Sequence, residues 1–120
     1  MLKHIEDLLE CINECKKEKI DYPDIEVLLK FLWILERVEG IVDIYDAHVY
    51  TCGKEAIMEW HSKNWANDKE NRAILSAMVS PNDKFICSYA GKENELHEYD
   101  KPERIVEQIV DYLERDIFQG

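Results

Sequence analysis

The chain has 120 residues, 46% of them apolar and 34% charged, a mixture that suits one folded domain with its own hydrophobic core. Its 26 acidic side chains outnumber its 15 basic ones and give a net charge of −11. This charge argues against direct binding to nucleic acid or to an anionic membrane, because both are themselves negatively charged. A basic protein surface is the natural counterpart, although acidity also simply keeps proteins soluble.

The N-terminal sequence is charged from Lys3 onward and contains no apolar run like that of a secretory signal. The densest apolar stretch, residues 27–35, is too short to span a bilayer and includes Lys30. We therefore expect a cytoplasmic protein without a membrane partner. In a reducing compartment its four cysteines are expected to be free thiols: Cys11, Cys15, Cys52 and Cys87.

Two helices are predicted in the first third of the chain, over residues 2–19 and 24–39. The first has an apolar stripe at spacings of three and four, and Pro23 with Asp24 suits the start of the second. The second is apolar on two adjacent faces, which leaves only a narrow strip for water: Glu26, Lys30, Trp33 and Arg37. We expect it to be the most buried element and to pair with the first helix as an antiparallel neighbour, because the connection is short.

Beyond residue 41 the apolar period changes from that of a helix to that of strands. Alternation and turn residues predict strands over residues 41–51, 55–61, 73–79, 84–90 and 95–99. A helix over residues 54–63 remains open as an alternative to the second strand, and residues 62–71 are predicted to form a loop. The short connections predict that neighbouring strands are antiparallel.

A third helix is predicted over residues 101–118. Asp100 and Glu103 have the spacing of a capping box, and Pro102 falls in the first turn, where proline is tolerated. Its wide apolar stripe should lie across the sheet. The element order predicts one α+β domain over residues 1–120: two N-terminal helices, an antiparallel β-meander of four or five strands, and a C-terminal helix packed on the sheet.

Residue types that carry metal or nucleophilic chemistry occur without a recognised spacing. His4, Cys11 and Cys15 would share one side of the first helix, but a structural zinc site needs a fourth ligand. Cys52 or Cys87 with a nearby histidine could form a nucleophile and base, which keeps a small cysteine/histidine-dependent enzyme open as an alternative. No glycine-rich oxyanion loop precedes either thiol. We expect no catalytic residue, no metal and no cofactor.

Acidic residues are concentrated toward the C-terminus, where residues 93–116 carry nine acids against three bases. Four of these acids recur on one side of the predicted third helix: Glu103, Glu107, Asp111 and Glu114. Such a surface could dock on a patch of arginine and lysine, or it could be an ordinary solvated helix face. Trp33, on the polar strip of the second helix, and Trp65, among polar residues, are candidate anchors of a partner contact, since tryptophan is enriched at interfaces.

The leading hypothesis is a small acidic binding or inhibitory protein, not an enzyme, that neutralises or regulates a basic protein partner. Toxin-immunity proteins, antitoxins and phage-encoded inhibitors of nucleic-acid enzymes share this size and charge as classes, so the partner could be a toxin or a nucleic-acid enzyme. Carboxylates would steer the encounter, and the bound protein would occlude the partner sterically. A structural module that forms oligomers through an exposed apolar strand edge is a further alternative.

Overall fold

The computed structural model describes residues 2–40, 45–62, 73–90 and 94–119. Within these ranges lie three helices and five strands, in the order α1 (Leu2–Glu18), α2 (Ile25–Val38), β1 (Tyr45–Cys52), β2 (Glu55–Ser62), β3 (Leu75–Ser80), β4 (Lys84–Ala90), β5 (Asn94–Tyr99) and α3 (Pro102–Gln119). The predicted α+β class and element order are confirmed. The loop predicted over residues 62–71 lies, apart from its first residue, outside the described ranges.

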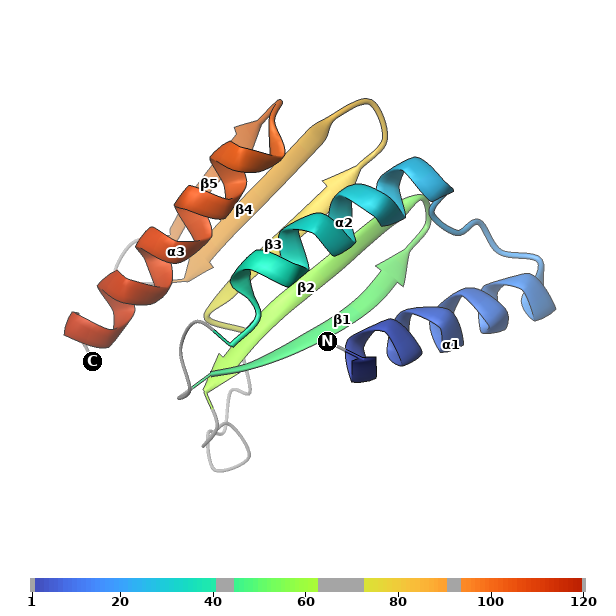
Figure 1. Cartoon of the computed structure of the whole chain (residues 1–120), viewed down its shortest axis with the longest axis horizontal. Helices are drawn as coiled ribbons and strands as arrows, with labels where there is room; N and C mark the ends of the chain where they lie inside the picture. Colours follow the sequence, from blue (N-terminus) through green and yellow to red (C-terminus); the bar gives the residue numbers. More distant parts are fainter. Residues whose placement is uncertain (1, 41–44, 63–72, 91–93, 120) are drawn as a thin grey trace.

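The five strands form one antiparallel sheet in the order β1-β2-β3-β4-β5, so each strand pairs with its neighbours in sequence (Figure 1). Along β2 the residues alternate between the two faces of the sheet: Ala56, Met58 and Trp60 are buried, whereas Ile57 and Glu59 are half-buried. β2 pairs with β1 on one side and with β3 on the other. The alternative of a helix over residues 54–63 is therefore wrong.

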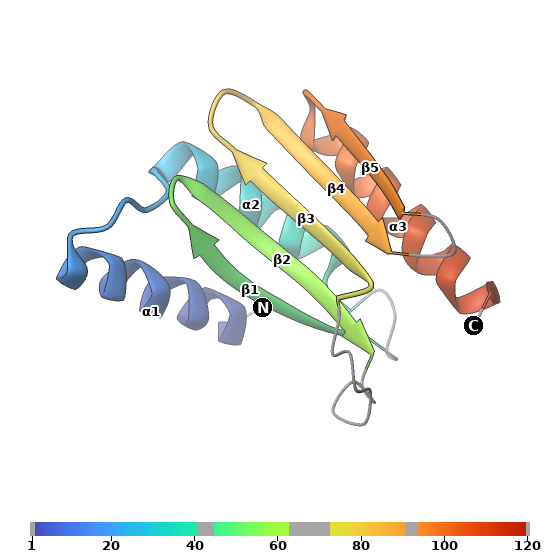
Figure 2. The same ribbon diagram turned by 180° about the vertical axis from the view of Figure 1, so that it is seen from behind.

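The helices cover one face of the sheet. α3 packs on β3, β4 and β5, α2 packs on β2 and β3 and against α3, and α1 lies along β1 at the edge of the sheet. The core fills the space between helices and strands, where the side chains of Phe31, Leu35, Met58, Phe85 and Ile109 are fully buried. Figure 2 shows the opposite face, across which no helix of the described ranges runs.

The surroundings of α2 differ from the prediction. α2 packs against α3, whereas α1 packs mainly on β1, so the expected pairing of the two N-terminal helices is wrong. Ile25 and Leu29 are 66% and 60% exposed, while Lys30 and Trp33 of the predicted polar strip are half-buried. A helix resting on one face of a sheet buries only the side turned to that sheet, so part of the second apolar stripe of α2 is left in water.

Local side-chain contacts fix where α1 and α2 sit. Asp24 is the N-cap of α2, and its carboxylate accepts a hydrogen bond of 3.0 Å from the backbone N–H of Val27. At the start of α1, His4 Nε2 lies 3.0 Å from the carbonyl oxygen of Ala47, and His4 Nδ1 lies 2.8 Å from Glu39 Oε1. His4 therefore links α1 to β1 and to the end of α2.

Candidate functional site

The outer side of α3 carries the four acidic residues that the sequence indicated. α3 buries Ile105, Ile109, Tyr112 and Leu113 against the sheet and α2. At 3.6 residues per turn the acids then point away from the sheet, and all four are exposed: Glu103, Glu107, Asp111 and Glu114. We call these four residues the acidic ridge. The structure thus brings the predicted acids together on one helix surface.

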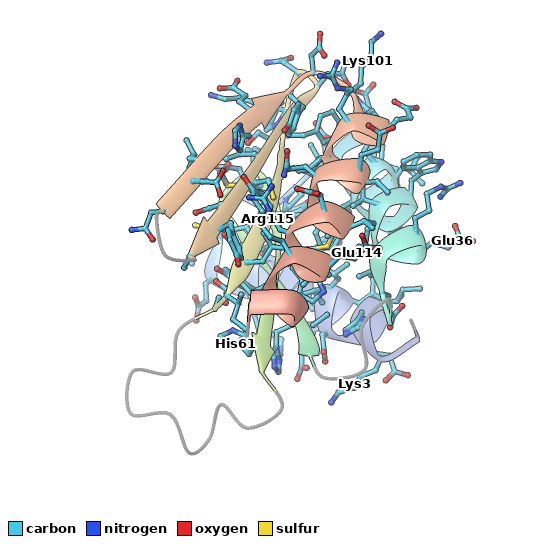
Figure 3. All side chains as sticks on the ribbon, turned by 90° about the vertical axis from the view of Figure 1, so that its left-hand side faces the viewer. Lys3, Glu36, His61, Lys101, Glu114 and Arg115 are labelled. Carbon is cyan, nitrogen blue, oxygen red and sulfur yellow. The ribbon has the colours of Figure 1, made fainter. Side chains whose placement is uncertain are left out.

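Most carboxylates of the acidic ridge have no ion pair in the part of the chain that the structure describes. Arg115 Nη2 lies 2.6 Å from Asp111 Oδ2, and Arg115 Nη1 donates a 3.1 Å hydrogen bond to Glu95 Oε2 on β5. Within the described ranges the other three ridge acids make no ion pair. In Figure 3 the side chains of Glu114 and Arg115 leave α3 in different directions. Arg115 thus ties Asp111 to the sheet, and the remaining carboxylates are left to solvent or to a partner.

Two adjoining hollows extend from the ridge to the end of the sheet. The larger, of about 790 Å³, is lined by Pro81, Asn82, Asp83, Lys84, Glu98, Tyr99, Asp100 and Arg104. The smaller, of about 240 Å³, is lined by Tyr99, Arg104, Glu107, Gln108 and Asp111. Because Tyr99 and Arg104 line both, the hollows are contiguous, and their walls carry five carboxylates against two basic side chains. Three of these carboxylates are already paired within the protein: Asp83 with Lys30, Glu98 with Lys84, and Asp111 with Arg115. Asp100 and Glu107 line the hollows without an ion pair among the described residues.

Tyr99 holds the shared wall of the two hollows in place. Its hydroxyl donates a 2.7 Å hydrogen bond to Gln108 Oε1 of α3, and the Arg104 guanidinium lies 5.7 Å from the centre of its ring. Burial raises the pKa of the Tyr99 hydroxyl, so it stays protonated at neutral pH. Sequence reasoning missed Tyr99, Gln108 and Asp83. The meander itself was the available signal, because consecutive antiparallel strands bring the β3–β4 turn and the start of α3 to the same end of the sheet.

Acidic residues also line α1, so the acidic ridge is not the only acidic surface. Glu6, Glu10 and Glu18 are exposed there and make no ion pair within the described ranges. However, the last turn of α1 is basic, and Lys16 lies 5.5 Å from the ring of Tyr22 in a hollow of about 510 Å³ that Lys19 and Lys54 also line. The described hollow beside α1 therefore carries more basic than acidic side chains, unlike those beside the ridge.

The two tryptophans have different outcomes. Trp33 packs half-buried against the core, its carbonyl accepts a 2.8 Å hydrogen bond from Arg37, and the Arg37 guanidinium lies 3.6 Å from the centre of its ring. Stacking of arginine on an aromatic ring stabilises the side chain where it is. Trp33 is thus tied into the structure and exposes only part of its ring. Trp65 lies outside the described residues.

The cysteines do not form an activated nucleophile in the described structure. Register places Cys87 opposite His97, but the Cys87 side chain is fully buried, and this burial raises the pKa of its thiol to about 12. Such a thiol stays protonated at neutral pH and is inert. Cys52 is exposed, and His48, four residues earlier on the same strand, lies about 13 Å away at the rise of a strand. That separation is too long for a hydrogen-bonded pair.

A polar cluster that sequence reasoning did not assemble lies on the open face of the sheet. The Tyr50 hydroxyl donates a 2.7 Å hydrogen bond to Glu59 Oε1, and His61 Nε2 lies 3.3 Å from Glu59 Oε2. The rings of His48 and His61 meet edge to face at 5.2 Å. Burial and the bond to Glu59 raise the pKa of Tyr50 to about 12. Among the described residues no set of three metal-ligating side chains comes together, here or around His4.

Comparison with known proteins adds no relative. No family model, no curated protein and no solved structure matches the chain. No helix in the described ranges has the length and apolar character that crossing a bilayer requires. The functional argument therefore depends on the surface of this molecule alone.

Proposed function

We propose that this protein is a small acidic binding protein that neutralises or regulates a basic protein partner, as toxin-immunity proteins, antitoxins and phage inhibitors do as classes. One observation carries the proposal: Glu103, Glu107 and Glu114 are exposed and make no ion pair among the described residues, and Glu107 lines a hollow whose walls carry more acids than bases. Carboxylates in this state attract arginine and lysine, with which they form charge-assisted hydrogen bonds.

The partner would be held by its cations and blocked by the bulk of α3. Like charges on the acidic ridge raise the association rate with a cationic surface, and this effect falls with ionic strength. The larger hollow, of about 790 Å³, would accept a long basic side chain beside Asp100, which makes no ion pair within the described ranges, whereas Asp83 and Glu98 are paired with Lys30 and Lys84. Tyr99 would flank that basic side chain with an aromatic ring, which favours a cation over its face. The mechanism is occlusion and not catalysis, and the protonated, buried thiol of Cys87 supports that choice.

A charge-matched pair of variants tests the proposal. The ridge variant carries Glu103→Lys, Glu107→Lys and Glu114→Lys; the control carries Glu6→Lys, Glu10→Lys and Glu18→Lys on α1. Each substitution adds two charges, so both variants shift the net charge of −11 by six units. Wild type and control are expected to capture the same cationic protein from a lysate of the source cells, and the ridge variant is expected to lose it.

Calorimetry with the purified partner makes the test quantitative. We expect the ridge variant to bind at least about tenfold more weakly, since the close charge pairs of an interface are commonly coupled by more than 1.4 kcal/mol. Raising the salt concentration should weaken binding of the wild type more than that of the ridge variant. Equal affinities for the ridge variant and the wild type would refute the proposal, as would a captured partner with an acidic surface.

A further inference from the structure

The open face of the sheet carries an apolar row that runs across its strands. Tyr50, Ile57, Met78 and Ile86 are consecutive cross-strand partners on β1, β2, β3 and β4, and Glu98 continues the row on β5. All four apolar members are only half-buried, although they lie on the face that no helix of the described ranges covers. An antiparallel sheet with one face in water normally places polar residues on that face.

Each of the three central strands places one apolar residue on the open face, at the centre of a short apolar run. β2, β3 and β4 each contain three consecutive apolar residues: 56–58, 77–79 and 85–87. The central residue of each run points away from the helices, and it is flanked along its strand on that face by polar residues such as Glu59, Ser76 and Ser88. Since the helices account for only one side, the residues at the centre of these runs are suited to a second packed layer.

We propose that the open face of the sheet binds the same face of a second copy of this chain, with a two-fold axis running along β3. A rotation about that axis places β2 over β4 of the other copy. Each cross-strand row of one copy then faces the same row of the other copy. Ile57 then faces Ile86 of the second copy, and Met78 faces itself. The inner positions Ile57 and Ile86 match in size and polarity about β3, as an isologous contact between identical surfaces requires, and the outer positions set Tyr50 of one copy over Glu98 of the other.

The polar rows on either side fit the same axis. Toward the hairpin end, Glu55 on β2 and Lys84 on β4 flank Ser80, whose hydroxyl donates a 2.7 Å hydrogen bond to Glu55. The two-fold rotation sets Glu55 of one copy over Lys84 of the other, twice. On the other side of the apolar row, Glu59 and Ser88 flank Ser76. The same rotation sets the Glu59 carboxylate of one copy over the Ser88 hydroxyl of the other. Opposite charges and hydrogen-bonding partners therefore meet across the axis, in a protein whose net charge is −11.

The size of the face suits a modest dimer. Five strands about 4.8 Å apart and six residues long span roughly 24 by 20 Å, or about 480 Å² before the relief of the side chains is counted. This approaches the about 600 Å² per partner at the lower end of stable interfaces. The strands of two stacked sheets cross at about 30°. At the distance of β2 and β4 from the axis, this rotation shifts facing positions by only about 2.5 Å, which isoleucine side chains can bridge. We therefore expect association in the micromolar range.

Sizing by light scattering and sedimentation tests the dimer. At about 0.5 mM the full chain is expected to have twice its mass of 14.2 kDa. Met78→Glu, which places two carboxylates on the axis, should raise the dissociation constant at least about a hundredfold. Leu29→Glu, on the exposed side of α2, is the control and should leave it unchanged. A single-chain mass at every concentration, or equal dissociation constants for Met78→Glu and wild type, would overturn the proposal.

A charge swap gives a second test that does not depend on the core of the interface. Glu55→Lys alone and Lys84→Glu alone should each weaken association about tenfold, because each creates two like-charged contacts across the axis. The double variant should restore it. A double variant as weak as the single ones would overturn the two-fold arrangement. The ridge substitutions should leave the mass unchanged, so failure here and failure of the partner-binding proposal are distinguishable.

Discussion

Removing the hydroxyl of Tyr112 is expected to stabilise the protein. The side chain is fully buried, and its ring stacks on that of Tyr89 with centres 4.6 Å apart and planes 15° apart. The hydroxyl oxygen has no hydrogen-bond partner among the described residues. A buried polar group without a partner costs about 1–3 kcal/mol, and Tyr112→Phe removes that group while it keeps the stacked ring. We expect the free energy of unfolding to rise by about 1 kcal/mol.

Tyr99→Phe is the matched control, because it removes a hydroxyl that does have a partner. Loss of the 2.7 Å bond to Gln108 Oε1 should lower the free energy of unfolding by about 1 kcal/mol. Urea unfolding followed by circular dichroism measures both variants, with an unchanged slope as the check that only stability has moved. If Tyr112→Phe destabilised the protein by more than about 1 kcal/mol, the Tyr112 hydroxyl would have to be hydrogen-bonded, and the reasoning would fail.

Tyr112→Phe should also reduce the loss of folding stability that the protein shows at alkaline pH. Burial is the main reason that the pKa of Tyr112 rises from 10.0 to about 12 in the folded protein. The folded state therefore holds this proton more tightly than the unfolded state, and the resulting stability is complete below pH 10. It is lost as the pH rises from 10 to 12, by up to about 3 kcal/mol for a shift of two units. Tyr112→Phe should lack this part of the loss. Parallel declines in wild type and variant above pH 10 would contradict the assignment.

Two further predictions concern the reactivity of Cys52 and Cys87 and the N-cap of α2. An alkylating reagent at neutral pH should label exposed Cys52 in the folded protein and Cys87 only after unfolding. Mass spectrometry of the labelled peptides measures the two rates, and equal rates would contradict the burial of Cys87. Asp24→Ala should lower the free energy of unfolding by about 1 kcal/mol through loss of the 3.0 Å bond to Val27 N–H, whereas Asp24→Asn should keep most of it. Urea unfolding distinguishes these outcomes, and equal losses would show that capping is not the cause.

The sequence predicts the elements well because each has a strong local signal. The segment from Lys84 to Ala90 alternates cleanly between turn residues, and β4 has these bounds. Asp24 sits where an N-cap is expected, and it does cap α2. Residues 55–61 were ambiguous, because periodicity alone does not separate a short strand from a short helix. What settles them is pairing on both sides with β1 and β3, which is a tertiary property.

The sequence did not predict which elements pack against one another, because an apolar stripe indicates that a residue is buried but not which neighbour buries it. Ile25 and Leu29 of α2 follow the helical period as well as Phe31 does, yet only Phe31 meets the sheet. The acidic ridge followed from spacing alone, since Glu103, Glu107 and Glu114 fall opposite the apolar stripe of their own helix. The hollows beside it did not, because Asp83 and Tyr99 come from separate strands and meet α3 only in the fold.

The acidic ridge and the apolar row lie on different faces of the molecule, and the two proposed interactions share only Lys84 and Glu98, which line the larger hollow and also lie on the open face of the sheet. Free carboxylates of α3 lie on the side away from the sheet, whereas Ile57, Met78 and Ile86 lie on the open face of the sheet. A contact through the sheet therefore buries none of the acidic ridge. It places the two ridges of a dimer on opposite outer surfaces, where repulsion between them is largely screened at physiological salt. A dimer built this way would bind two partner molecules independently, one on each ridge. If the partner presents two basic sites whose spacing matches that of the two ridges, the second contact becomes intramolecular and strengthens the overall binding.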